Sequence, residues 1–202
     1  MSQFLKLISK ILILGCFTSG CSSQPQQVPT NIPRVDLIPL SLGILTSEEI
    51  NTSGSLKVND GLIISDRSDC LPKDCAFSIW DVLEQDTLAL TVSNSTIQLA
   101  ISLRSFQTSD DATAYAEKIF GENAGQPGIQ MIEIPIELLP EQSWAYAEDG
   151  RLVHVSTVYG NIQIGISFSQ YTGGMNDPEK AAVILANVAK MQIDKLTLLS
   201  SR

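Results

Sequence analysis

Residues 143–169 read SWAYAEDGRLVHVSTVYGNIQIGISFS, a stretch in which apolar and polar side chains alternate. A period of two residues is typical of strands with one buried face. Two dipeptides that favour tight turns, Asp149-Gly150 and Gly160-Asn161, interrupt the alternation. The stretch therefore predicts three consecutive antiparallel strands, at 143–148, 151–158 and 161–169.

Further strands are expected before this stretch, at residues 76–82, 88–92, 97–103 and 130–136. Ser93-Asn94-Ser95 predicts a turn that joins the second and third of these runs into a hairpin. Residues 56–65 are ambiguous, but Asp60-Gly61 favours a turn within a hairpin.

Capping signals mark two helices in this part of the chain. Thr46 and Glu49 form a capping box, which predicts a short helix over residues 47–52. Ser109-Asp110-Asp111 opens a second helix, because acidic residues favour a helix N-terminus. Gly121 is the expected stop of this second helix.

The last helix has the clearest pattern. Asp177 is its expected cap and Pro178 its first residue. Its buried stripe is expected to hold Ala181, Ile184, Leu185, Val188, Met191 and Ile193 or Leu196. Helices thus alternate with groups of strands, an order that predicts an α+β domain with a mainly antiparallel sheet and helices packed on one face.

The first twenty residues are organised like an export signal. Lys6 and Lys10 are positive, Ile11 to Phe17 form a short apolar core, and Thr18-Ser19-Gly20 are the small residues that a peptidase needs before Cys21. The apolar core is too short for a membrane span, which needs about 20 residues. We therefore expect residues 1–20 to be cleaved.

This organisation resembles that of bacterial lipoprotein precursors, whose lipobox ends in a small residue and a Cys. Ser19-Gly20-Cys21 matches that end, although Thr18 stands where Leu is usual. The resemblance implies a lipid on Cys21. Cys16 ends a competing lipobox, but cleavage there would leave a shorter apolar core and an odd thiol at Cys21. A secretory signal cut without lipid is a further alternative, although no Ala precedes Ala76 to form an Ala-x-Ala site.

The Ser/Gln/Pro-rich residues 21–41 are expected to be a flexible tether to a single domain at 42–202. The lipoprotein resemblance implies a domain that faces the periplasm or the exterior, anchored to the membrane by its lipid. Ser22 is compatible with an outer-membrane location if the envelope is Gram-negative.

The charge balance bears on the partners of the domain. The chain has 13 basic and 22 acidic residues and a net charge of −9. Lys6 and Lys10 fall in the signal, which has no acidic residue, so the mature chain has a balance of −11. Such a domain should repel phosphate backbones and anionic head groups, so nucleic-acid binding is not expected.

Cys70 and Cys75 lie inside the domain and are spaced C-x-x-x-x-C. In an oxidising compartment this pair is expected to form a local disulfide, worth about 2 kcal/mol because its loop is short. Two cysteines and one histidine cannot complete a tetrahedral zinc site, and the spacing is not that of a redox C-x-x-C.

A second resemblance covers about residues 42–196. Leu45-Thr46-x-Glu48-Glu49-Ile50, a Cys before a strand that contains Trp80, and a closing hairpin with an Ala-rich helix are similar to a group of bacterial lipoproteins. Their domains resemble PsbP-like and kinase-sensor extracytoplasmic folds. Because many members of this group have no known activity, the resemblance implies little about function.

His154 is the only histidine of the chain and lies within a predicted strand. Its side chain is expected on the solvent face, opposite Val153 and Val155. Ser156, Ser143 and Ser167 are candidate neighbours for a hydrolase, but none lies in a G-x-S-x-G elbow. We expect no catalytic residue here.

Other residues could in principle support chemistry. The candidate carboxylates for glycoside hydrolysis are Asp110, Asp111, Glu133, Glu137, Glu141, Glu148 and Asp149. They occupy a helix start, a loop and turns, where acidic residues are structurally favoured. No calcium loop or P-loop occurs, so no metal or cofactor is expected. The aromatic residues Trp80, Trp144, Tyr146, Tyr159 and Tyr171 could line a recognition surface. Of these, Trp80 and Trp144 are expected in the core, and Tyr159 and Tyr171 near the surface.

The sequence thus favours a lipid-anchored, non-catalytic binding or accessory domain, with an envelope protein or a small molecule as its ligand. Two alternatives stay open. One is a structural or assembly subunit of a membrane complex, as the PsbP-like resemblance implies. The other is an extracytoplasmic hydrolase that uses His154.

Overall fold

The computed structural model describes residues 39–54, 56–60, 62–65, 74–84, 97–135, 137–170 and 177–201. All of them fall within one structural unit, Ile32–Arg202. The expected signal peptide, Cys21 and most of the expected tether lie outside the described residues, so the cleavage, the lipid and the boundaries at 21 and 42 stay predictions.

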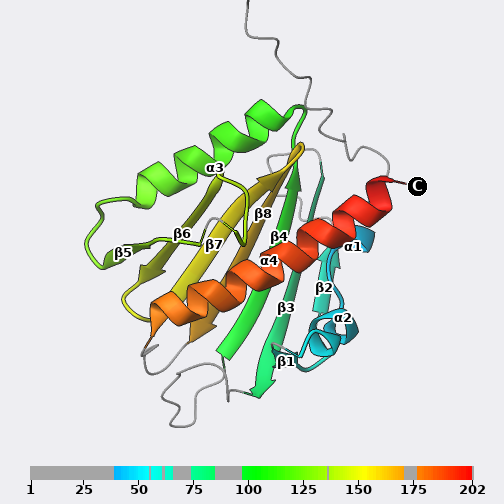
Figure 1. The fold of residues 1–202 in the computed structure, drawn as a ribbon, viewed down its shortest axis with the longest axis horizontal. Coiled ribbons are helices and arrows are strands. Elements are labelled where there is room, and N and C mark those ends of the chain that lie inside the picture. The colour runs from blue at the N-terminus through cyan, green and yellow to red at the C-terminus, as the bar shows by residue number, and fades with distance from the viewer. Residues whose placement is uncertain are drawn as a thin grey trace, which may run out of the picture. The chain divides into compact units, whose positions relative to one another are not determined.

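An antiparallel sheet of eight strands forms the centre of this unit (Figure 1). Its order is β1–β3–β4–β8–β7–β6–β5, with β2 also paired to β3. The strands are Lys57–Val58 (β1), Leu62–Ser65 (β2), Asp74–Glu84 (β3), Ile97–Ser105 (β4), Ile129–Ile132 (β5), Ser143–Glu148 (β6), Leu152–Tyr159 (β7) and Ile162–Gln170 (β8).

The three consecutive strands expected after residue 143 are confirmed as β6, β7 and β8. Asp149 and Gly150 both have a positive φ, of 48° and 64°, which a tight turn between β6 and β7 requires. Gly160 has a φ of 58° at the next turn. The predicted bounds of β7 and β8 were early by one residue, a shift within the usual uncertainty of strand ends.

Two expected hairpins are wrong. β1 and β2 do not pair with each other: both pair with β3, so residues 57–65 run along one edge of the sheet. The neighbours of β4 are β3 and β8, so β4 does not pair with residues 88–92, which lie outside the described residues. Local turn signals favoured a hairpin in both places, but the long strand β3 pairs with β1, β2 and β4 instead.

The helices are Leu40–Gly43 (α1), Ser47–Thr52 (α2), Ser109–Asn123 (α3) and Pro178–Ser200 (α4). The capping box of Thr46 and Glu49 is confirmed at α2, and the Asp177 cap with Pro178 is confirmed at α4. Gly121 does not stop α3, which continues to Asn123. The short α1 was not expected.

The prediction of an α+β fold with a mainly antiparallel sheet is confirmed. In the central strands, side chains alternate between two faces. On the first face lie Val155 and Ile166, and α4 runs diagonally across it (Figure 1). The helices α1 and α2 contribute to the same hydrophobic core, which agrees with helices packed on one face. The exception is α3, whose Ala112 and Ala116 pack with Val158 of β7 at one end of the second face.

The main core lies between the first face and α4. Fully buried side chains include Trp80, Leu99, Ile166, Phe168 and Leu185. Burial of each large apolar side chain contributes about 1.5–3 kcal/mol. The predicted stripe of α4 is largely confirmed, because Met191 and Ile193 are partly buried against this core and its other members are buried. Most apolar residues of the central strands thus belong to this core, and the centre of the second face is polar.

Candidate functional site

A cluster of polar side chains occupies the centre of the second face. Ser102 and Arg104 come from β4, His154 and Ser156 from β7, and Gln163 from β8. The register places Arg104 opposite Gln163 and Ser156 opposite Gly165, so these side chains lie on adjacent strands and on one face. We refer to these five residues as the polar cluster.

Hydrogen bonds join four members of the polar cluster into one chain. Nη1 of Arg104 donates to Oε1 of Gln163 over 2.9 Å and to Oγ of Ser102 over 3.3 Å. Nε2 of Gln163 then donates to Oγ of Ser156 over 2.9 Å. Gln163 and Ser156 are buried, so these bonds satisfy groups that have lost water. These hydrogen bonds hold the Arg104 guanidinium group in a defined position.

Gly165 lies under the polar cluster and leaves room for it. A Cβ atom at this position would lie 2.7 Å from Oγ of Ser102 and 3.2 Å from both Nε2 of Gln163 and Cε1 of His154. Since real Cβ atoms essentially never approach other atoms as closely as 2.7 Å, a side chain at this position would have to displace Ser102. The side chains of three strands therefore converge above one backbone position.

Helix α3 covers the Arg104 end of the polar cluster. Cζ of Arg104 lies 5.7 Å from the centre of the Tyr115 ring, which is within the range of a cation–π contact. The Tyr115 ring in turn lies 5.1 Å from that of Phe106. Within the described chain, no carboxylate lies within ion-pair distance of Arg104.

His154 occupies the other side of the polar cluster, and its ring lies 5.3 Å from the ring of Tyr146. Burial, and next the positive charge of Arg104, lower the pKa of His154 to about 4 from its ordinary value of 6.5. Burial, and next the negative charge of Glu148, raise the pKa of Tyr146. At neutral pH both His154 and Tyr146 are therefore uncharged, and Arg104 is the cation of this cluster.

The prediction that His154 points away from Val153 and Val155 is confirmed, and Ser156 shares its face. The expected solvent exposure of His154 is wrong, because the ring is partly buried beside Tyr146. Tyr146 comes from the neighbouring strand β6, where it lies directly opposite His154 in the ladder.

The three candidate serines have different environments. The described contacts of Ser156 include a bond from Gln163 and none from His154. Oγ of Ser143 donates to Oγ1 of Thr157. Ser167 pairs with His154 across the ladder, without a described side-chain bond. None of the three is therefore joined to the imidazole in the described structure.

Sequence reasoning missed Arg104 and Gln163. Each is a polar residue in a strand whose polar and apolar side chains alternate, so the sequence alone predicts that it faces solvent. The register of β4 against β8 brings the two together, and a single sequence does not show that register.

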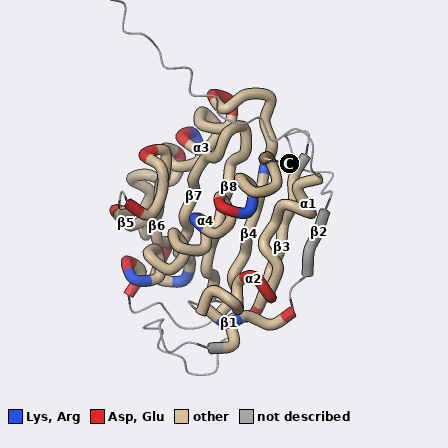
Figure 2. The backbone as a smooth tube through the Cα atoms, turned by 45° about the vertical axis from the view of Figure 1, so that its right-hand side comes forward, with Lys and Arg blue, Asp and Glu red and all other residues tan. Residues whose placement is uncertain are grey.

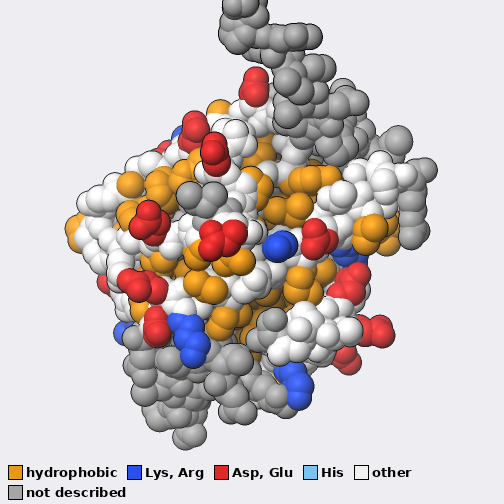
Figure 3. All heavy atoms as spheres, viewed as in Figure 1, with side chains coloured by type: hydrophobic (Ala, Val, Ile, Leu, Met, Phe, Trp, Pro, Cys, Tyr) orange, Lys and Arg blue, Asp and Glu red, His pale blue; other side chains and the backbone are white. Residues whose placement is uncertain are grey.

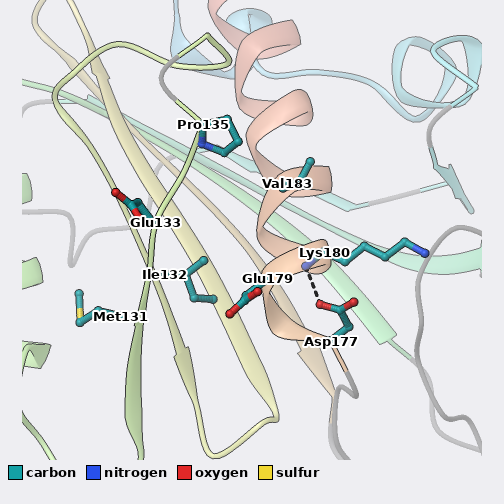
Figure 4. A pocket seen from close by; sticks show the side chains of 8 residues that line it. All are labelled: Met131, Ile132, Glu133, Pro135, Asp177, Glu179, Lys180 and Val183. Carbon is teal, nitrogen blue, oxygen red and sulfur yellow. Dashed lines mark hydrogen bonds between the residues drawn. The ribbon is translucent and has the colours of Figure 1, made fainter.

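A separate pocket lies between the end of β5 and the start of α4 (Figure 4). Its volume is about 610 Å³, and its lining consists of Met131, Ile132, Glu133, Pro135, Asp177, Glu179, Lys180 and Val183. The Asp177 carboxylate accepts a 2.9 Å hydrogen bond from the backbone N–H of Lys180, so it caps α4. The lining combines apolar side chains with charged ones, and the start of α4 explains the acidic groups of Asp177 and Glu179.

Of the cysteines, the structure describes Cys75, which takes part in a disulfide bond. Cys70 lies outside the described residues, as do Cys16 and Cys21, so the pairing of Cys70 with Cys75 stays a prediction. Cys75 lies opposite Arg104 in the β3–β4 ladder.

The candidate carboxylates are dispersed over several elements (Figure 2). The described residues contain no group of three acidic, histidine or cysteine side chains that could hold a metal ion. Asp110 and Asp111 lie in the first turn of α3, Glu148 ends β6, Asp149 forms the following turn, and Glu133, Glu137 and Glu141 lie between β5 and β6.

The other four aromatic residues singled out in the sequence have different environments. Trp80 is buried in the core, as expected, and Trp144 packs partly buried against Phe120 of α3. The Tyr159 hydroxyl accepts a hydrogen bond from Thr197 of α4, and Tyr171 lies outside the described residues.

The surface that carries α4 shows apolar side chains in several places, with charged groups between them (Figure 3). The described helices include none that is long and apolar enough to cross a membrane. In comparisons with protein families, curated proteins and solved structures, nothing matched this chain.

Proposed function

We propose that this chain is an extracytoplasmic lipoprotein, anchored through Cys21, whose domain acts by binding rather than by catalysis. The anchor rests on the charged start, apolar core and Ser19-Gly20-Cys21 ending of the sequence. The binding role rests on the environment of His154 and Ser156, the pair on which a hydrolase would depend.

The observation that carries the binding role is the hydrogen-bond chain from Arg104 through Gln163 to Ser156. A serine nucleophile needs a base within hydrogen-bond reach, whereas the Ser156 hydroxyl is held by an amide that Arg104 fixes. A base is also most effective when its pKa is near the working pH, and the pKa of His154 is about 4. Both features favour a structural rather than a catalytic role for His154 and Ser156.

A turnover screen tests this role directly. The mature protein, His154→Ala and Ser156→Ala are assayed against a broad set of ester and peptide substrates, with thermal unfolding measured in parallel. We expect no turnover above the uncatalysed rate in any of the three. Turnover that is lost in both variants while the folded state is retained would show that the domain is a hydrolase.

The positive arm of the test is a search for the ligand. The mature protein is recovered from its own membranes in mild detergent, and bound molecules are identified by mass spectrometry. A stoichiometric small molecule or one recurring envelope protein is expected. A large complex that falls apart when the protein is removed would instead favour the assembly role.

A further inference from the structure

Arg104 is a cation without a described counter-charge. The Nη1 hydrogens of its guanidinium group go to Ser102 and Gln163, which are both neutral. Arginine has five N–H donors, so the Nη2 and Nε donors remain without an acceptor in the part of the chain that the structure describes. Those three donors form the edge that matches a carboxylate in a bidentate pair.

The guanidinium edge is also held in place before any ligand arrives. Gln163 and Ser102 fix one nitrogen, and the Tyr115 ring lies against the group. A donor pair that is already ordered loses less entropy when it binds an anion. In a chain with a net charge of −9, an unpaired and half-buried arginine is not explained by general surface charge.

We propose that Arg104 is the centre of a binding site for a carboxylate that carries an apolar or aromatic body. This inference rests on the proposed binding role and specifies its ligand class. Tyr115 lies beside the guanidinium group with Phe106 next to its ring, and Tyr146 lies beside His154, so the surroundings suit an apolar body. A phosphate dianion would lose more hydration here than a carboxylate and is disfavoured.

The carboxylate could belong to a free organic acid or to the C-terminus of a peptide, and both present the same group to Arg104. Benzoate serves as the probe for the first source and N-acetyl-glycyl-phenylalanine for the second. Benzamide, a neutral molecule of the same shape as benzoate, controls for apolar contact alone, and inorganic phosphate controls for charge alone.

His154 provides the readout, because it is the one histidine of the chain and the charge of Arg104 acts on it. Its Cε1–H resonance is followed by NMR during titration of the mature, membrane-extracted protein with each probe. Benzoate or the peptide is expected to shift this resonance saturably, with a Kd of about 1 mM, a typical value for a weak fragment. Because a bound anion offsets the charge of Arg104, it is also expected to raise the pKa of His154.

Variants assign the effect to the guanidinium group. Arg104→Gln is expected to weaken benzoate binding at least tenfold and to raise the pKa of His154 without any ligand. Arg104→Lys keeps the positive charge but cannot donate two parallel hydrogen bonds to a carboxylate. It is expected to weaken benzoate binding while leaving the pKa of His154 low. Arg151→Gln, at an exposed position in the turn before β7, is the matched control and should bind as the wild type does.

Equal affinity of the wild type and a folded Arg104→Lys or Arg104→Gln would overturn the proposal, as would equal binding of benzamide or tighter binding of phosphate. So would the absence of any saturable shift in the folded wild type. These failures would remove the carboxylate site alone, since the binding role itself fails through the turnover screen. Stronger binding of the peptide than of benzoate would support the proposal and assign the carboxylate to a protein partner.

Discussion

Gln192 of α4 accepts a hydrogen bond from the backbone N–H of Leu45 over 3.0 Å, and both residues are buried. The same amide donates to the carbonyl of Gly43 over 2.7 Å. The Gln192 side chain therefore holds the connection between α1 and α2, the first two described helices. Lys195 adds a bond to the carbonyl of Ile44.

Gln192→Ala is expected to lower the free energy of unfolding by about 2–4 kcal/mol, because it leaves a buried N–H and a buried carbonyl without partners and opens a cavity. Urea unfolding at neutral pH measures the loss. Asn187→Ala, which removes a more exposed amide from the same helix, is the control and should change stability by about 0.5 kcal/mol or less. Similar values for the two variants would mean that the Gln192 bonds do not hold the helix connection.

Gly165→Ala is expected to destabilise the domain by about 1–3 kcal/mol, because its Cβ would collide with Oγ of Ser102. Adding Ser102→Ala removes that oxygen, so the double variant should be more stable than the sum of the two single effects predicts. Gly121→Ala is the matched control. Gly121 lies inside α3 with open space around it, so alanine there should stabilise the domain by about 0.5–1 kcal/mol. If the changes in unfolding free energy of Gly165→Ala and Ser102→Ala simply add in the double variant, the Cβ at position 165 does not collide with Oγ of Ser102.

His154 should make stability depend on pH. Its pKa is about 4 in the folded protein against an ordinary value of 6.5, so the unfolded chain takes up its proton first as the pH falls. Stability is then fully present above pH 6.5 and declines toward pH 4, with a loss of about 2–3 kcal/mol near the lower end of that range.

The pH dependence is measured by urea unfolding of the wild type and His154→Gln across the range between the two pKa values. The difference in unfolding free energy between the two proteins should shrink as the pH falls, because the variant lacks the titrating group. A difference that stays constant over this range would mean that the pKa of His154 is not shifted.

The disulfide of Cys75 is expected to have Cys70 as its partner. Thiol labelling of the denatured, unreduced mature protein should fail at both positions, and a peptide map should show the two linked. Reduction of the same sample is the control, since it should expose both thiols to the label. Labelling of Cys70 without reduction would rule out this pairing.

Much of the fold follows from local patterns in the sequence. The alternation in β6, β7 and β8, the turn at Asp149 and the caps at Thr46 and Asp177 are each set by neighbouring residues. The wrong hairpins show the limit of this reasoning. β3 pairs with both short strands of residues 57–65 and with β4, so nonlocal contacts decided pairings that local turns suggested otherwise.

The polar cluster was less accessible to sequence reasoning. The face shared by His154 and Ser156 could be predicted from alternation, but the partner of Ser156 could not. Gln163 reaches Ser156 because β7 and β8 are in register, and Arg104 joins them across β4. Partial burial of His154 depends on Tyr146 of β6, which a pattern within one strand does not reveal.

The anchor at Cys21 is the premise of the proposed function, and the mass of the intact mature protein tests it most directly. The protein is extracted from the membranes of its own cells and measured without digestion. We predict a chain that begins at Cys21 and is heavier than its amino-acid sequence by the mass of an attached lipid. A soluble chain with an unmodified Cys21, or a mature chain that begins at another residue, would contradict the account.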